Sequence, residues 1–164
     1  MKLIHYLMGT AVLWACTYAY ATGSGEFTRK GQTTKLPNAY ALRQADHFDD
    51  KKILTTVLFS TMPLDTAKVD AASDRMKEAE SQLGQLDAFY AELDIGADGK
   101  LEMIGFFGPG LSVSGGASEQ PVLVQNDEKR IEGTFRSKDE KEKAGSSGGF
   151  YDLKFALDIA PAKH

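Results

Sequence analysis

The stretch "KKILTTVLFSTM", residues 51–62, decides the fold. After its two lysines it contains no charged residue and is dominated by β-branched and large apolar side chains, which is typical of a β-strand. Because side chains alternate along a strand, Val57 and Phe59 point to one face and Leu54 and Leu58 to the other. Apolar side chains on two faces need cover on both. The stretch therefore predicts a strand with a core on one side and a second layer on the other.

The second layer is predicted to be a helix. Apolar residues recur at alternating steps of three and four across residues 65–87, with charged residues between them. Asp65 follows Pro63 and Leu64 and has a side chain suited to cap a helix N-terminus. We expect one amphipathic helix of about six turns over residues 65–87, packed on the sheet.

After the predicted helix the period changes to two. Residues 89–95 place apolar side chains on one face and Tyr90, Glu92 and Asp94 on the other, and residues 150–159 alternate in the same way. We expect the polar face of each of these strands to meet water. The pair Asp98-Gly99 predicts a hairpin turn between the strand at 89–95 and the next one.

The order of elements predicts the fold class. Three strands, one helix and then five or six strands, joined by short links without any βαβ repeat, favour antiparallel pairing. We expect an α+β domain over residues 22–164, in which one amphipathic helix packs on 8–9 strands. The strands form either a curved antiparallel sheet or a partly open β-barrel.

The first 21 residues have the three parts of a secretory signal. A basic Lys2 precedes a short apolar run, and Ala19-Tyr20-Ala21 places small side chains at the −3 and −1 positions of a cut before Thr22. The apolar run is shorter than the ~20 residues that a membrane-spanning helix needs. We expect residues 1–21 to be a signal peptide that directs the chain to the periplasm or outside the cell.

A second reading of the leader makes Cys16 a lipid attachment point. Leu13 and Ala15 stand where a bacterial lipoprotein signal has its −3 and −1 residues, which would make residues 1–15 the signal. Trp14 between them fits such a signal poorly. Lipidation at Cys16 would tether the domain to a membrane, which the rest of the chain would not touch.

Composition narrows the function classes. The chain has a net charge of −4 and no cluster of basic residues interleaved with aromatic ones, so we expect no nucleic-acid partner. Its single cysteine is Cys16, so a chain cut after Ala21 has neither disulfides nor thiol chemistry. No motif calls for a cofactor.

The densest polar cluster lies between two predicted strands. Asp46, His47, Asp49 and Asp50 place three carboxylates and an imidazole within five residues, the donor types that a divalent cation takes. A solvated loop would have the same composition. The cluster is the candidate metal site of the chain.

Aromatic residues are the candidates for ligand binding. Phe106 and Phe107 follow each other in the glycine-rich segment "GFFGPG", so they point to opposite faces of a strand. Phe106 either lies under the helix or lines a ligand or partner surface. Tyr40 is the third candidate.

No arrangement of residues predicts catalysis. A chain without the leader has only His47 and His164 as imidazoles, and no Gly-x-Ser-x-Gly elbow is present. We expect an exported bacterial envelope protein that acts as a non-catalytic binding module for a small apolar ligand or a protein partner. The alternative is a small metal-dependent hydrolase centred on the cluster around His47.

Overall fold

The structure is a computed structural model that describes residues 22–46, 49, 51–116, 118–137 and 149–160. The described chain runs as four strands, two helices and six further strands. The elements are β1 (Thr22–Arg29), β2 (Gln32–Leu36), β3 (Asn38–Ala45), β4 (Ile53–Ser60), α1 (Thr66–Ala71), α2 (Arg75–Gln85), β5 (Tyr90–Ile95), β6 (Leu101–Gly108), β7 (Leu111–Gly115), β8 (Val122–Asn126), β9 (Arg130–Arg136) and β10 (Phe150–Ala160). The predicted signal peptide at residues 1–21 and the alternative lipidation site at Cys16 lie outside the described residues.

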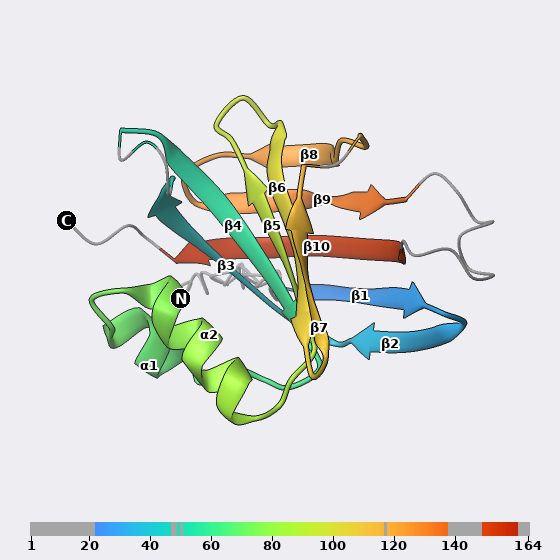
Figure 1. Cartoon of the computed structure of the whole chain (residues 1–164). Helices are drawn as coiled ribbons and strands as arrows, with labels where there is room; N and C mark the ends of the chain where they lie inside the picture. The colour runs from blue at the N-terminus through green and yellow to red at the C-terminus, as the bar shows by residue number, and fades with distance from the viewer. Residues whose placement is uncertain (1–21, 47–48, 50, 117, 138–148, 161–164) are drawn as a thin grey trace, which may run out of the picture.

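The ten strands form one open, mostly antiparallel sheet that folds over on itself. Strands β8, β9, β10, β1 and β2 form one part, here called the β1 half, and strands β3 to β7 form the other, the β4 half. Figure 1 shows the strands of the two halves crossing steeply, with the helices on the outer side of the β4 half. The predicted α+β class and curved sheet are confirmed at this level.

Strand β10 joins three units that are each local in sequence. It pairs antiparallel with β1 and with β9, so it connects the β1–β2 hairpin to the β8–β9 hairpin. At its end it pairs with β3 in parallel, through Ile159 with Ala41 and Ala160 with Leu42. This short parallel ladder joins the two halves by backbone hydrogen bonds. The sequence favoured antiparallel pairing and did not predict it.

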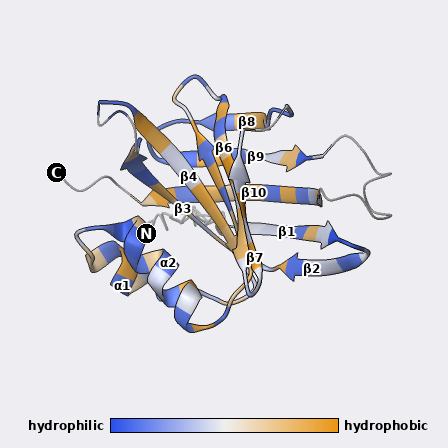
Figure 2. Cartoon of the chain, viewed as in Figure 1, coloured by the Kyte–Doolittle hydropathy of each residue, from blue (hydrophilic) through white to orange (hydrophobic). Residues whose placement is uncertain are grey.

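The main core lies between the halves. It takes the inward side chains of both, among them Phe59 and Leu93 from the β4 half and Phe135 and Leu153 from the β1 half, all of which are buried. Figure 2 shows the resulting pattern: hydrophobic and hydrophilic residues alternate along β10, whereas β4 is hydrophobic along most of its length.

Strand β4 is buried on both faces, as its sequence predicts. Leu58 points away from the main core and packs with Leu42, Val69 and Ala79 in a second cluster, in which the helices cover the outer face of the β4 half. The second layer predicted from residues 51–62 is therefore confirmed.

The predicted single helix over 65–87 is wrong, because the segment forms two helices. Ala72 takes an extended conformation, and Asp74 then caps a new helix by accepting a hydrogen bond from the backbone N–H of Lys77 at 3.0 Å. Aspartate competes well for such a cap, so it starts α2 where an uninterrupted helix would leave it in the interior.

The number of strands is also larger than predicted. The structure has ten strands where 8–9 were expected, and one of the additional turns is that of the β1–β2 hairpin. Lys30 and Gly31 both have positive φ, 49° and 76°, which suits a two-residue hairpin turn.

Within the described residues the sheet does not close into a barrel. Strands β2 and β7 lie at the two ends of the strand order and do not pair with each other. The barrel alternative is therefore not realised, and the space between the two halves has an open side.

Candidate functional site

The three aromatic residues predicted to bind a ligand lie in three different places. Phe106 points inward from β6 and packs between the two halves of the sheet. Phe107 is on the opposite face of the same strand, and Tyr40 is on the outer face of β3. The interpretation that Phe106 lies under the helix is wrong, because its neighbours are the rings of Phe27 and Tyr151 in the β1 half.

Phe107 is occupied by contacts within the protein. Its ring stacks on that of Tyr90, with the centroids 4.9 Å apart. It also lies over Gly105, where a Cβ would come within 2.3 Å of the ring. The absence of a side chain at Gly105 therefore lets Phe107 fold back onto its own strand.

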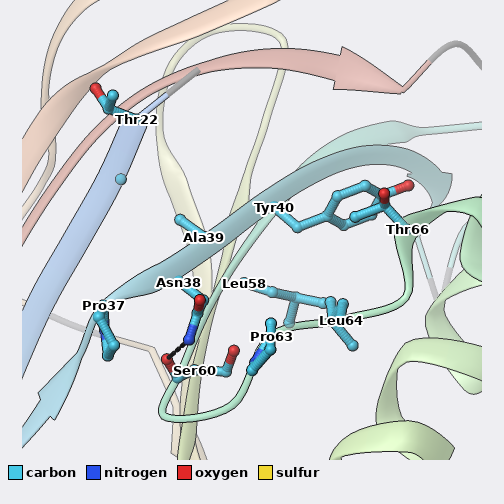
Figure 3. A pocket seen from close by; sticks show the side chains of 11 residues that line it. Thr22, Pro37, Asn38, Ala39, Tyr40, Leu58, Ser60, Pro63, Leu64 and Thr66 are labelled. Carbon is cyan, nitrogen blue, oxygen red and sulfur yellow. Dashed lines mark hydrogen bonds between the residues drawn. The ribbon is translucent and has the colours of Figure 1, made fainter. Parts of the chain in front are cut away.

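Tyr40 lines a cleft of about 370 Å³ between the start of β1, the start of β3 and the segment that leads into α1 (Figure 3). The side chains drawn in Figure 3 come from strands β1, β3 and β4, from the first residue of α1 and from the links before β3 and α1. The lining residues are Thr22, Gly23, Pro37, Asn38, Ala39, Tyr40, Leu58, Ser60, Pro63, Leu64 and Thr66.

Three polar side chains of the Tyr40 cleft are already paired. The Tyr40 hydroxyl donates to Asp70 at 2.7 Å, and burial together with this bond raises the pKa of Tyr40. The Asn38 amide donates to the Ser60 carbonyl at 3.2 Å, and the Ser60 hydroxyl donates to the Met62 carbonyl at 2.5 Å. The cleft therefore has a shape that a ligand can fill, but few of its hydrogen-bonding groups are free.

A second cavity lies where the sheet is open. Along the inward face of β7, Leu111 is buried, whereas Val113 is 52% exposed and Gly115 is exposed. Val113 pairs with Phe106 and Gly115 pairs with Ile104, and both of these β6 side chains point into the core. Val113 and Gly115 therefore face the space between the two halves. The β1 half stops covering the β4 half at this point.

We call this cavity the aromatic opening. It has a volume of about 220 Å³. Its lining residues are Phe27, Arg29, Ile104, Phe106, Leu111, Val113, Ser114, Gly115, Gly116, Gly149 and Tyr151.

Stacked rings from both halves form the floor of the aromatic opening. The rings of Phe27 and Phe106 stack with centroids 4.2 Å apart, and Tyr151 stands 5.5 Å from Phe106. On its other side, Tyr151 stacks on Phe135 at 4.8 Å. A Cβ at Gly149 would lie within 2.0 Å of the Phe27 ring, so only glycine leaves room for that ring here. Flat apolar surfaces of this kind suit an apolar or aromatic ligand.

Only part of the predicted metal site lies in the described chain. Asp46 is half-buried, with the Lys52 ammonium 3.6 Å away, and the exposed Asp49 accepts a hydrogen bond from the backbone N–H of Lys51. His47 and Asp50 lie outside the described residues. Within the residues that are described, no three His, Cys, Asp or Glu side chains are grouped to hold a metal ion.

Two carboxylic acids are buried where the sequence predicted a wet surface. Glu92 and Asp94 on the outer face of β5 are only 5% and 6% exposed, so the expectation that they meet water is wrong. Asp94 accepts a hydrogen bond from the Thr56 hydroxyl at 2.5 Å, and Thr56 in turn accepts one from Gln44 at 2.8 Å. Burial raises the pKa of Asp94 above its usual value, and the Thr56 bond works against this shift.

Glu92 has no such support. Among the described residues no side chain donates a hydrogen bond to it, and its charged neighbours are Asp94 and Glu80. Burial, followed by the charges of Asp94 and Glu80, raises the pKa of Glu92 to about 8. The carboxyl group is therefore largely protonated at neutral pH.

Searches of family models, of curated proteins and of solved structures found no match. In the described part of the chain, neither helix has the length and apolar character needed to cross a membrane.

Proposed function

We propose that this protein is an exported, non-catalytic binding module of the bacterial envelope that takes up a small apolar ligand in the aromatic opening. The observation that carries the proposal is the uncovered inward face of β7. Val113 is 52% exposed on a face that is buried elsewhere in the sheet, and it stands next to the stacked rings of Phe27 and Phe106. A bound apolar molecule would cover this surface and gain the free energy of its removal from water.

Export rests on the leader alone. Lys2, the short apolar run and the small residues at the −3 and −1 positions of Ala19-Tyr20-Ala21 suit a cut before Thr22.

Mass spectrometry of the protein purified from its host tests the export proposal. We expect a chain that begins at Thr22 and carries no acyl mass. A lipid on Cys16 would support the membrane-anchored alternative, and a full-length chain in the cytosol would overturn export.

A cavity-filling variant tests the binding proposal. A Cβ added at Gly115 meets no atom within 4 Å, so Gly115→Leu extends a side chain into the aromatic opening without a steric clash. We expect the neutral fluorescent probe N-phenyl-1-naphthylamine to bind the wild-type protein and to bind this variant at least tenfold more weakly, as about 1.4 kcal/mol of lost contact would produce.

The matched control is Gly84→Leu. Gly84 is an exposed residue of α2 whose added Cβ also meets no atom within 4 Å. It should bind the probe as the wild type does. Equal binding by the wild type and Gly115→Leu would show that the aromatic opening is not the site. If the wild type does not bind the probe, the proposal of a small apolar ligand fails and a protein partner is favoured.

A further inference from the structure

Arg29 lines the aromatic opening, and in the described part of the chain no acid is paired with it. It lies on β1, two residues after Phe27, so its side chain is on the same inward face. The residue is half-buried, and no described residue forms a hydrogen bond or an ion pair with it. A guanidinium group on the inward face with no acid partner among the described residues can bind an anion through charge-assisted hydrogen bonds.

Arg29 also connects the aromatic opening to a neighbouring cavity. A cavity of about 200 Å³ lies on the other side of Phe27 and shares Phe27, Arg29 and Leu111 with the opening. The rest of its lining is mixed, with the apolar Phe89 and Pro109 beside the polar Lys30, Gln32 and Thr34. Arg29 therefore lies between an aromatic cavity and a more polar one.

Three other cations of the β1 half are paired with acids. Arg130 lies 2.9 Å from Asp158, Arg136 lies 3.7 Å from Asp152, and Lys35 forms an ion pair with Glu26. All three are on outward or edge positions of the half, where they neutralise neighbouring acids. Arg29 differs from them in facing inward and in having no acid partner within the described ranges.

We propose that the ligand of the aromatic opening is an amphipathic organic anion, with an apolar body against Phe27 and Phe106 and a carboxylate or sulfonate on Arg29. This inference rests on the proposed binding function and adds the chemical class of the ligand. A planar guanidinium group matches the two oxygens of such a headgroup with two parallel hydrogen bonds.

Two probes with the same apolar body test the inference. The anion 8-anilinonaphthalene-1-sulfonate has the body of N-phenyl-1-naphthylamine and adds one sulfonate. We expect Arg29→Gln to weaken binding of the sulfonate probe about tenfold, the effect of losing a charge-assisted hydrogen bond. Binding of the neutral probe should change less than twofold.

Lys154→Gln is the control for net charge. Lys154 is an exposed residue on the outward face of β10, so it removes the same charge away from the opening. It should leave the affinity for both probes unchanged. Arg29→Lys keeps the charge without the planar fork and should fall between the wild type and Arg29→Gln. Circular dichroism of each variant checks that it is folded.

The outcomes separate this inference from the function on which it rests. If the wild type binds neither probe, the proposed binding function fails. If it binds both, and Arg29→Gln weakens both equally or neither, the aromatic opening remains a binding site but its ligand is not held as an anion by Arg29. A loss of sulfonate binding in Lys154→Gln equal to that in Arg29→Gln would likewise overturn the inference.

Discussion

The rings of Phe27 and Phe106 stack across the two halves of the sheet, with their centroids 4.2 Å apart and their planes 17° from parallel. Phe27 belongs to β1 and Phe106 to β6, strands that are far apart in the strand order. Where the ladder of hydrogen bonds does not close, this contact between side chains holds the two halves together.

Removing the ring of Phe106 should therefore destabilise the protein more than its place beside a cavity suggests. Phe106→Ala should lower the free energy of unfolding by about 3–5 kcal/mol, because it removes a buried side chain and the contacts of its ring with two other aromatic rings. Urea denaturation measures the difference. Val113→Ala, on the same inward face but half exposed, should cost less than about 1 kcal/mol. Similar losses in both variants would contradict the bridging role of the stack.

Stability should depend on pH through Glu92. Burial and the charges of Asp94 and Glu80 raise the pKa of Glu92 to about 8, whereas a glutamate in an unfolded chain has a pKa of about 4.3. Between these values the folded chain holds a proton that the unfolded chain has released, so the free energy of unfolding falls as the pH rises. The contribution should be complete below about pH 4 and lost above about pH 8, with a slope of at most about 1.4 kcal/mol per pH unit.

Glu92→Gln removes this titration while keeping a neutral side chain of the same shape. We expect urea denaturation between pH 5 and pH 8 to give a flatter dependence for this variant than for the wild type. Glu128→Gln is the control, because the Glu128 side chain is 88% exposed. An unchanged slope in Glu92→Gln would assign the dependence to another group.

The hydrogen bond from Thr56 to Asp94 should be worth a measurable part of the stability. Thr56→Val keeps the shape of the side chain but leaves the buried Asp94 without this donor, so the free energy of unfolding should fall by about 1–3 kcal/mol. Thr55→Val is a matched control on the opposite face, since the buried Thr55 has no side-chain hydrogen bond among the described residues. Thermal unfolding should show a lower midpoint for Thr56→Val alone, and the reverse order would refute the assignment.

The break between the helices should depend on Asp74. Asp74→Ala removes the cap of α2 and should lower the free energy of unfolding by about 0.5–2 kcal/mol. Asp74→Asn keeps a side-chain oxygen that can accept from the Lys77 N–H, so its stability should stay close to that of the wild type. If Asn and Ala at this position are equally destabilising, the charge of Asp74 matters more than its capping bond.

Much of the fold could be predicted because local patterns carry it. The two apolar faces of residues 53–60 require a layer on each side, and the period of two in residues 150–159 gives β10 its inward and outward faces. The split of the helix and the hairpin at Lys30-Gly31 were missed, because both depend on a few residues that override a longer pattern.

The candidate site was predicted less well, since it is assembled from distant parts of the chain. Phe106 was among the proposed ligand contacts, but its partners Phe27 and Tyr151 lie far from it in sequence. The burial of Glu92 was likewise hidden, because its alternation with apolar residues is that of a strand with one wet face. Glu92 pairs with Leu58 of β4, and β4 carries apolar side chains on both faces. That pattern was the one feature of the sequence that indicated a covered outer face.

The place of β10 bears on how the chain is made. The β1–β2 hairpin, the β8–β9 hairpin and the strands β3 to β7 can each pair locally, but their hydrogen-bond ladders are joined only through β10, the last strand of the described chain. Contacts so distant in sequence are slow to form, because the chain must close long loops before they stabilise it. The complete sheet therefore cannot form until β10 has been synthesised, although the units that it joins can begin to form earlier.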